Sequence, residues 1–456
     1  MAGIGFELRK ILRRESYWSV FQAYGYAGII SSGPWILSIL GLLVIGLSTV
    51  SSENLGGQVA QFQISVTYLI AASLILTGFI QSSFTRFVAD RLFEKRDGLV
   101  LPNFHGVVCL VTVVTALVGT MAVVILFPRQ SLLYRVLMVG SFVVLANVWV
   151  GTIFLSGLKQ YQGILILFAV GYGISVGAAR LCSSYGLEGL LFGFFLGQFV
   201  LLLGIMGLTF RHYSSPDFWS WEFLKKGSLF RELIWLGFFY NAALWVDKIL
   251  FWYFPHTGQF IIGPLKSSPI YDLPIFLAYL AILPGMASFL VRMETDFVER
   301  HAEFYDGIRN GASLDYIEEA KSGMVRTARQ GLYEIMKIQG VVCLICWWSG
   351  PTILSWLGIS MLYESLLYID VVAASFQVVF LGILNTLFYL DKRGLALRLT
   401  ILFFLSNGLF SLATLMGGIT WYGYGFAGAV LLVVVAGLYQ LDKTFQKLEF
   451  ETFMLQ

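Results

Sequence analysis

Two opposite charges lie side by side inside an apolar stretch of this sequence, "NAALWVDKILFW" at residues 241–252. One helical stripe of this stretch is formed by residues spaced four, three and four apart, namely Asn241, Trp245, Lys248 and Trp252. Asp247 lies about 100° from that stripe, beside Tyr240 and Phe251. Ionisable residues inside a membrane usually face a bundle interior or a water-filled cavity and take partners there. We therefore expect this helix to take part in the function of the protein and not only to anchor the chain in the membrane.

The residue types on this helix suit a carbohydrate. The flat faces of Trp245 and Trp252 match the apolar C–H faces of sugar rings, and indole N–H groups donate hydrogen bonds. Asp247 and Lys248 would hold water or hydroxyl groups beside them, so the segment is predicted to line a substrate path. Two other interpretations stay open. One is a structural ion pair, with Asp272 at the start of the next span as a further partner for Lys248; the other is a lysine that extends to the membrane surface.

Composition assigns the chain to the polytopic membrane class. Of its 456 residues, 57% are hydrophobic and 12% are charged, which is about half the charged share of a soluble protein. A helix needs roughly 20 apolar residues to cross a bilayer. Twelve such segments are present, at residues 20–48, 62–89, 103–127, 133–155, 162–181, 187–210, 231–254, 270–292, 335–357, 365–390, 395–416 and 421–441. The sequence therefore predicts an all-α membrane protein with twelve transmembrane helices.

The positive charges predict how the chain crosses the membrane. If the N-terminus is cytoplasmic, most of the 30 Lys and Arg residues fall on the cytoplasmic side. Only Arg129, Arg135, Arg180 and Lys266 then fall on the opposite side. Because cytoplasmic loops are rich in Lys and Arg, both termini are predicted to be cytoplasmic. The net charge of +3 gives no indication of a nucleic-acid partner.

A weak internal repeat divides the chain into two halves of six spans. A YGxxG motif opens the last span of each half, at Tyr185 and Tyr424, and a basic turn followed by Gly163 or Gly394 opens the fifth. Parallel repeats of this kind are related by an axis along the membrane normal, and we expect two six-helix lobes with a cavity between them. The predicted parts are a cytoplasmic interfacial segment at 1–19, an N-lobe at 20–210, a cytoplasmic linker at 211–230, a C-lobe at 231–441 that includes a cytoplasmic helical loop at 293–334, and a cytoplasmic tail at 442–456.

The loop at 293–334 has the pattern of two helices broken at Asn310-Gly311, with Ser313 as the N-cap of the second helix. Acidic residues come early in that second helix and basic residues late, an order that suits the helix dipole. The loop is interpreted either as a solvated connector or as a docking surface for a cytoplasmic partner.

Prolines interrupt two of the predicted spans. Gly33 and Pro34 lie in the "SSGPWIL" of the first span, and Pro274 and Pro284 lie in the eighth. Proline removes a backbone hydrogen bond and kinks or breaks a helix. These four residues are hinge candidates, and static kinks are the alternative.

Little in the sequence supports an enzyme. No P-loop GxxxxGK[ST] is present, and the acids within or near the spans are few, namely Asp247, Asp272 and Asp370. The four histidines are scattered, and the CxxC at Cys343 and Cys346 lies in a hydrophobic helix without a second ligand pair. We expect no catalytic residue, metal site or cofactor.

Three stretches carry a family resemblance over the whole chain: "MAGIGFELRKIL" at the start, "SSGPW" in the first span and "WVDKILFW" in the seventh. Together they resemble the PelG family of the multidrug/oligosaccharidyl-lipid/polysaccharide (MOP) exporter superfamily, whose fold is two six-helix lobes. The resemblance implies export of an N-acetylgalactosamine-rich exopolysaccharide, Pel, across the bacterial inner membrane for the biofilm matrix. It also implies a complex with the Pel cyclic-di-GMP receptor, a small membrane subunit and a cytoplasmic glycosyltransferase, in contact with membrane lipids. It supplies no catalytic motif.

Three other functions remain as alternatives. A flippase for lipid-linked oligosaccharides would need a cavity rich in Arg and Lys for the pyrophosphate, whereas Lys248 is the single deep cation. A small-molecule/cation antiporter would need buried carboxylates, for which Asp247 is the strong candidate. A purely structural scaffold is the third. The energy source of transport cannot be read from the residues.

Overall fold

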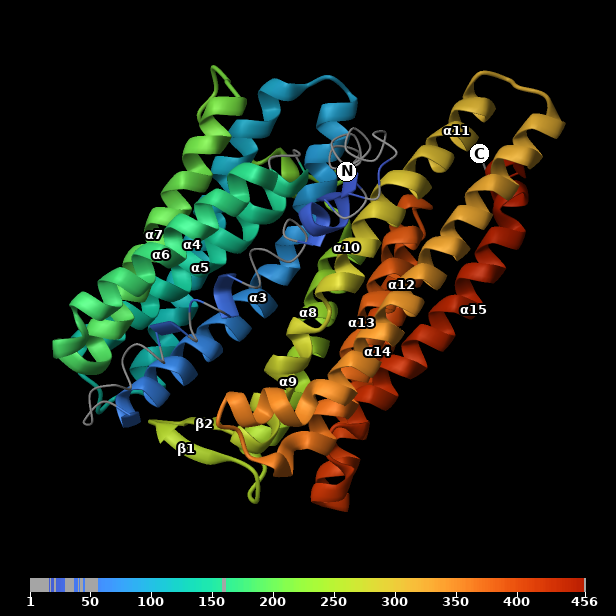
Figure 1. Ribbon diagram of the computed structural model, residues 1–456. Helices are drawn as coiled ribbons and strands as arrows, with labels where there is room; N and C mark the ends of the chain where they lie inside the picture. The colour runs from blue at the N-terminus through green and yellow to red at the C-terminus, as the bar shows by residue number, and fades with distance from the viewer. Residues whose placement is uncertain are drawn as a thin grey trace. The chain divides into compact units, whose positions relative to one another are not determined.

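The computed structural model describes residues 16, 18–19, 22–28, 37–39, 41, 44–45, 56–157 and 161–454, and Figure 1 shows its helices and strands. The helices are α3 (Gly56–Phe93), α4 (Val100–Leu126), α5 (Leu132–Gly157), α6 (Tyr161–Leu181), α7 (Gly186–His212), α8 (Arg231–Tyr253), α9 (Pro269–Leu280), α10 (Leu283–Val291), α11 (Val298–Arg309), α12 (Leu314–Trp356), α13 (Glu364–Tyr389), α14 (Arg393–Gly417) and α15 (Tyr424–Met454). A π-helical turn, η4 (Arg292–Phe297), joins α10 to α11. A small antiparallel hairpin pairs β1 (Gln259–Ile262) with β2 (Leu265–Ser267).

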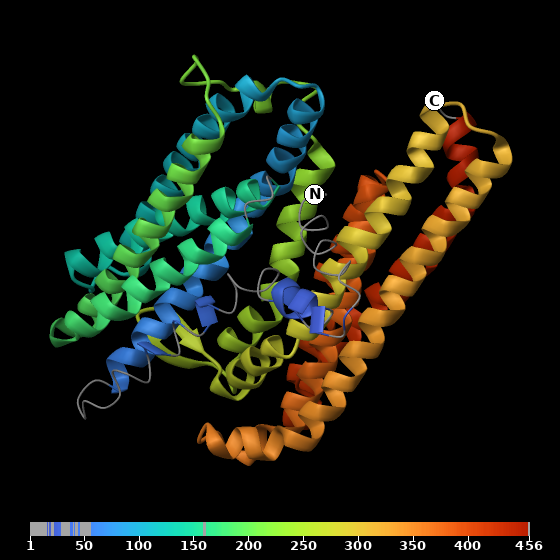
Figure 2. The ribbon, with the colours of Figure 1, turned by 45° about the horizontal axis from the view of Figure 1, so that its top comes forward.

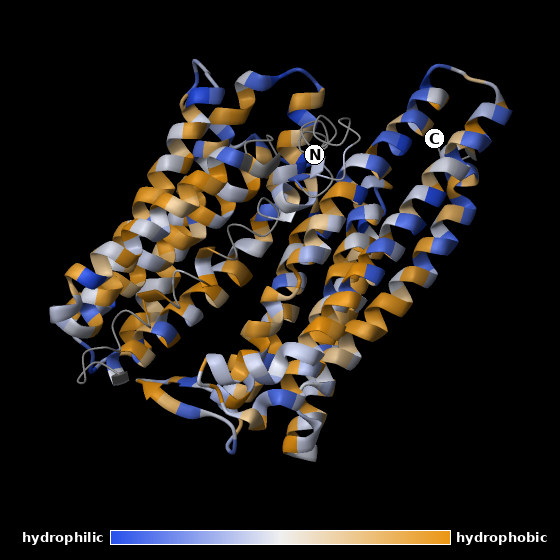
Figure 3. Ribbon diagram, in the orientation of Figure 1, coloured by the Kyte–Doolittle hydropathy of each residue, from blue (hydrophilic) through white to orange (hydrophobic). Residues whose placement is uncertain are grey.

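Eleven helices in the described ranges are long and apolar enough to cross a membrane. They correspond to the second to twelfth predicted spans, so those spans are confirmed as helices. The first predicted span, 20–48, lies largely outside the described residues. Figure 3 shows apolar residues along the middle of the helices and hydrophilic residues at many of their ends, as expected for helices that cross a bilayer.

The helices form two compact units, each with its own interior. The first, unit A, contains residues 33–245 and 252–268, and therefore α3 to α7, most of α8 and the β-hairpin. Within unit A, α6 and α7 lie side by side in Figures 1 and 2. Glycine makes this contact possible, because a Cβ at Gly171 would lie 2.9 Å from Leu201 Cβ and 3.1 Å from the Gly197 carbonyl oxygen. Small residues let membrane helices approach closely.

A second glycine contact joins α3 to α8 in unit A. A Cβ built on Gly78 would lie 2.6 Å from the carbonyl oxygen of Gly237 and 2.9 Å from the side chain of Asn241. A Cβ built on Gly237 would in turn collide with the carbonyl oxygen of Gly78. The two backbones therefore touch directly, with no space for a side chain on either helix.

The second unit, unit B, contains residues 1–32, 246–251 and 269–456. Helix α13 is at its centre: it packs against α9, α12, α14 and α15 and is buried over most of its length. The eighth predicted span, 270–292, is broken between α9 and α10. Pro274 lies inside α9, and Pro284 lies in the first turn of α10, where proline is well tolerated because its missing N–H has no intrahelical partner there.

The predicted helical loop at 293–334 is confirmed as two helices, α11 and α12, which extend the spans on either side. Helix α11 ends at Arg309, and Gly311 reverses the chain with a φ of 64°. The Ser313 side chain accepts a hydrogen bond from the Tyr316 N–H and caps α12, as the sequence predicts. The predicted tail at 442–456 is no separate element, because α15 continues to Met454.

The contact-based units differ from the lobes that the sequence repeat predicts. In the lobes, the chain divides at 211–230, whereas the unit boundary falls inside α8 and after the β-hairpin. A sequence repeat reflects the duplication of a segment, whereas a unit is defined by contacts between residues. The two need not have the same boundaries, so the division into lobes stays a prediction.

Candidate functional site

Helix α8 is the element that positions the predicted site. It runs for 23 residues from Arg231 to Tyr253. Asp247 comes 16 residues after Arg231, or roughly 24 Å along the helix at 1.5 Å per residue. The two charges therefore lie near the far end of the span, and the structure decides which neighbours they meet.

The Asp247 carboxylate is fully buried and has three hydrogen-bond donors. The Tyr271 hydroxyl of α9 donates to Oδ2 at 2.6 Å, and the Lys248 ammonium lies 3.2 and 3.3 Å from the two oxygens. Asn407 of α14 donates from Nδ2 to Oδ1 at 3.4 Å. A buried carboxylate needs such donors because it has lost its water.

The Lys248 side chain is 3% exposed and turns back to its neighbour Asp247. Its Nζ also lies 3.5 Å from the Tyr279 hydroxyl and 5.3 Å from the ring centres of Tyr279 and Phe426. Aromatic faces attract cations, most strongly when both are desolvated. The ammonium is thus held in the interior of unit B, beside aromatic rings and Asp247.

A second carboxylate joins this cluster from α13. Asp370 is fully buried, and the charges of Lys248 and Asp247 act on it. Neither of its oxygens has a hydrogen-bond partner in the part of the chain that the structure describes. A Cβ on Gly423, which has a φ of 85°, would lie 3.3 Å from Asp370 Oδ1. Asp370 therefore has the burial of Asp247 without its donors.

Several residues of this cluster lie near helix ends, whereas Asn407 lies in the middle of α14. The set consists of Asp247, Lys248, Tyr271, Tyr279, Asp370, Asn407 and Phe426, hereafter the Asp247–Lys248 cluster. Asp247 lies near the end of α8, whereas Tyr271 and Asp370 lie near the starts of α9 and α13. Spans that alternate in direction place such ends on the same face, so the cluster agrees with the predicted alternation.

The two predicted tryptophans belong to unit A. Trp252 is 1% exposed and stacks on Tyr68 of α3, with ring centres 4.5 Å apart and planes 27° apart. Trp245 is 5% exposed and lies 6.1 Å from the Trp252 ring. Asn241 donates to the carbonyl oxygen of Gly237 at 3.0 Å. The two tryptophans therefore lie on the same side of α8, as the predicted stripe requires. The Lys248 ammonium points away from this stripe and toward Asp247.

The remaining predicted residues are placed as follows. Asp272 is buried in the first turn of α9, and Tyr240 is half-buried on α8. The predicted contact between Asp272 and Lys248 stays a prediction. Gly33 and Pro34 lie outside the described residues.

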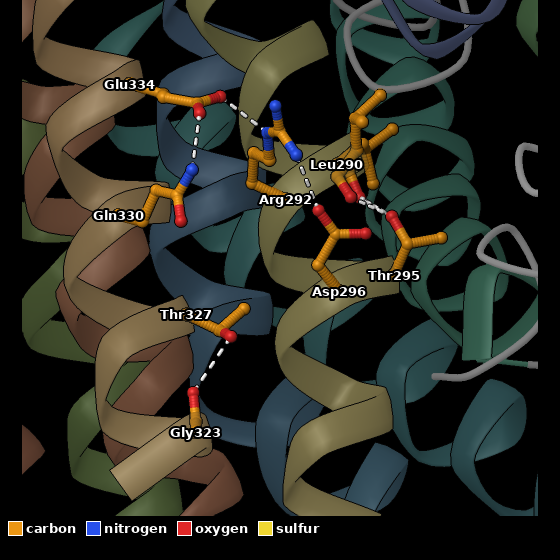
Figure 4. Close-up of polar contacts among 9 residues, drawn as sticks. Leu290, Arg292, Thr295, Asp296, Gly323, Thr327, Gln330 and Glu334 are labelled. Carbon is orange, nitrogen blue, oxygen red and sulfur yellow. Dashed lines mark hydrogen bonds and ion pairs between the residues drawn. The ribbon is translucent and has the colours of Figure 1, made fainter. Parts of the chain in front are cut away.

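Sequence reasoning missed a second polar network, at the other end of α13 (Figure 4). Arg292 opens the π-helical turn η4 and forms ion pairs with Asp296, at 2.8 Å, and with Glu334 of α12. Nearby, the buried Glu294 accepts hydrogen bonds from Asn385 at 3.0 Å and from the Tyr389 hydroxyl at 2.8 Å. π-Helical turns often occur at functional sites. No signal for the turn was visible in residue spacing.

Within the described ranges, no group of three or more His, Cys, Asp or Glu residues is arranged to hold a metal ion. All four cysteines are free thiols. Cys343 contacts the Ser375 hydroxyl at 3.3 Å, as a packed side chain.

Solved structures of MATE transporters share this fold. The outward-facing conformation of a multidrug resistance MATE family transporter of the MOP superfamily superposes with a TM-score of 0.64 at 14% identity, covering 94% of this chain and 96% of that one. A MATE structure in a bent conformation gives 0.65 at 15% identity, with the same coverage. A MOP superfamily transporter from Pyrococcus furiosus gives 0.61 at 14%, again over 94% and 96%. At such identities the likeness shows the fold alone: a multi-pass membrane protein built as these transporters are.

The sequence identifies the family. The family profile of PelG, described as an exopolysaccharide exporter (EPS-E), matches residues 1–453. The chain therefore belongs to the PelG family, and it is a transporter rather than an enzyme. No curated protein matches the sequence.

Proposed function

We propose that this protein moves the Pel exopolysaccharide, an N-acetylgalactosamine-rich polymer, across the bacterial inner membrane for the biofilm matrix. The observation that carries the proposal is the match to the exopolysaccharide exporter family over residues 1–453. The fold shared with MATE transporters supports transport as the activity.

The charge balance of the interior supports a polymer without pyrophosphate. Lys248 is the only buried lysine or arginine among the residues that the structure describes, and its charge is matched by Asp247 at 3.2 Å. A lipid-linked oligosaccharide carries a pyrophosphate, which would need unmatched cations. Such a flippase is therefore the weaker alternative. Asp370 favours the antiporter alternative instead, because a buried carboxyl without donors suits the uptake of a cation.

We propose that the polymer path includes Asp247, Lys248, Tyr240, Asn241, Trp245, Trp252 and Asp272. Trp245, Trp252 and both charges are buried here, so contact with a polymer requires that helices move. The break between α9 and α10 supports Pro274 and Pro284 as a hinge, and Gly33 and Pro34 complete the hinge candidates. The two lobes of the sequence repeat, N-lobe 20–210 and C-lobe 231–441, are the parts proposed to move.

Both termini are proposed to be cytoplasmic, on the basis of the Lys and Arg asymmetry between loops. A reporter fused at Thr257, in the turn between α8 and β1, should then be active in the periplasm. One fused at Asn310 between α11 and α12 should be active in the cytoplasm. A cytoplasmic signal at Thr257 would contradict this orientation.

The α12 surface is proposed to dock the cytoplasmic glycosyltransferase, in a complex with the cyclic-di-GMP receptor and a small membrane subunit. Lys321 and Arg329 form ion pairs with Glu449 and Asp442 of α15, so reversing their charge would disturb this protein itself. Residues of α12 and α15 line a groove on this surface, and Arg326 is exposed within it.

Arg326→Glu should therefore reduce co-purification with the glycosyltransferase, whereas Arg309→Glu, on the exposed end of α11, serves as the matched control. Equal recovery of the glycosyltransferase with both variants would indicate that α12 is a solvated connector and not a docking surface.

The function is tested in a strain that lacks the gene and is complemented with the wild-type chain. Complementation should restore N-acetylgalactosamine polymer outside the inner membrane, whereas the deletion strain should keep it in the cytoplasm. Restoration of lipid-linked oligomers in the periplasm would favour the flippase. Altered drug resistance with unchanged polymer export would favour the antiporter.

A further inference from the structure

The segment between α7 and α8 is more than a linker. Residues 213–224, hereafter the strap, contain "FWSW" followed by a buried Phe223. Sequence reasoning placed this segment in a cytoplasmic linker. In the structure it lies against the first turns of α4, within unit A.

Three hydrogen bonds fix the strap to α4. The Phe218 carbonyl oxygen lies 2.8 Å from His105 Nδ1, and the Ser220 N–H donates to the Pro102 carbonyl oxygen at 3.1 Å. The Phe223 N–H donates to Asn103 Oδ1 at 3.2 Å. These bonds hold the backbone of residues 218–223 of the strap against α4.

Gly106 makes the close approach possible. A Cβ at this position would lie 2.5 Å from the Ser220 carbonyl oxygen and 3.2 Å from the Phe223 ring. The strap therefore packs on the bare backbone of α4, and Ser220 is the residue that faces the helix.

The strap covers the continuation of a lipid-facing stripe. Val113 and Leu117 follow Gly106 by 7 and 11 residues, which places each of them within about 20° of Gly106 around α4. Val113 is 51% exposed and Leu117 is 68% exposed, as is usual for apolar side chains that face lipid. The strap thus lies where that lipid-facing side of α4 reaches the end of the span.

The aromatic rings of the strap are on its outer side. Phe218, Trp219 and Trp221 are 65%, 49% and 43% exposed. The indoles of Trp219 and Trp221 are nearly parallel, with planes 11° apart and ring centres 6.3 Å apart. Lys225 and Lys226 follow, both exposed. Rigidly held, half-exposed rings have no advantage in water, because each exposes apolar area.

We propose that the strap is a lipid contact: Phe218, Trp219 and Trp221 lie in the headgroup layer of the bilayer, with Lys225 and Lys226 beside the lipid phosphates. Tryptophan is enriched at membrane interfaces because its ring is apolar and its N–H is polar. A basic residue near an anionic leaflet is attracted to its lipid phosphates. Continuity with the exposed stripe of α4 favours lipid over a sugar chain.

The test uses the full-length chain with its four cysteines replaced by alanine, and with one cysteine introduced at a time. Trp219→Cys and Trp221→Cys carry a nitroxide label, in vesicles of phosphatidylethanolamine and phosphatidylglycerol. Ser214→Cys, exposed in the same segment, is the aqueous control, and Leu117→Cys is the lipid control. Size-exclusion profiles confirm that each variant is folded.

Labels at 219 and 221 are expected to be several-fold less accessible to a water-soluble nickel chelate than the label at 214. They should also be more accessible to dissolved oxygen. Equal nickel access at 214, 219 and 221 would overturn the proposal. So would protection of 219 that appears only when an N-acetylgalactosamine oligomer is added, because the rings would then bind sugar.

Discussion

The two ends of α13 hold polar networks of similar composition in different surroundings. At one end, Lys248 lies with the carboxylates Asp247 and Asp370, at exposures of 0 to 3%. At the other, Arg292 pairs with Asp296 and Glu334, and the three side chains are 16 to 36% exposed. The number of ion pairs at each end is therefore a poor guide to how much they stabilise the fold. Water can replace a lost partner in the half-exposed Arg292 network but not in the buried cluster.

This difference predicts which network can change. Removal of one partner from a buried pair leaves an uncompensated charge, at a cost of about 3–5 kcal/mol. A half-exposed pair contributes roughly 0.2–1 kcal/mol and weakens with salt. The buried pair of Asp247 and Lys248 is therefore expected to be intolerant of substitution, and the Arg292 network tolerant.

The largest effect is expected from Lys248→Met, which removes the only buried cation among the described residues. Asp247 and Asp370 then have no cation, and we expect a loss of about 3–5 kcal/mol. Thermal unfolding of the purified protein and its abundance in membranes measure this loss. Lys226→Met, an exposed lysine, is the matched control.

The double variant Asp247→Asn with Lys248→Met separates stability from transport. It should recover most of the abundance, because the strongest uncompensated charge is gone. If the charges contact the polymer, export stays low in the recovered protein. Wild-type export by the double variant would refute a role in the path.

A smaller effect compares the two buried carboxylates. Asp247→Asn weakens charge-assisted bonds from Lys248 and Tyr271 but leaves Asp370 as a carboxyl within electrostatic range of Lys248. The cost should therefore be below that of Lys248→Met, at about 1.5–3 kcal/mol. Asp370→Asn removes a carboxylate without donors among the described residues, and should leave the unfolding temperature unchanged or slightly raised. Lost export by a stable Asp370→Asn protein would favour cation coupling. Equal destabilisation by both variants would contradict the contrast drawn between them.

The smallest effect is expected from Arg292→Gln. Its charge is 33% exposed, so the loss should be about 1 kcal/mol or less. Unfolding temperatures of the wild type and the variant, measured in low and high salt, should converge as salt screens the pairs. A loss as large as that of Lys248→Met would show that this network is as essential as the buried one.

Local chemistry explains what could be predicted from the sequence. Ser313 caps a helix through its own hydroxyl, and Asn310-Gly311 turns the chain without help from distant residues. The spans follow from apolar run length alone. Pro284 is a hinge candidate inside a single predicted span, and in the structure it lies in the first turn of α10, where its ring restricts its own backbone.

The rest depends on how helices rotate and pack. The charges at 247 and 248 were visible as exceptions in an apolar run, but their partners Tyr271, Asn407 and Asp370 come from three other helices. Hydropathy does not encode those rotations. Trp252 was visible in the sequence as an aromatic residue of the stripe, but its stacking partner Tyr68 on α3 was not. The π-helical turn widens the helix locally by one residue per turn and leaves no mark in composition.

The contact between Gly78 and Gly237 also has an evolutionary consequence. Each glycine blocks a side chain on the other helix, since a Cβ at either position meets the opposite carbonyl oxygen. Neither residue can be replaced first, even if a double replacement with a wider helix spacing were viable. The pair should therefore persist together in the lineage of this chain, or be lost together by a shift of α3 against α8. We expect no viable substitution at only one of these two glycines.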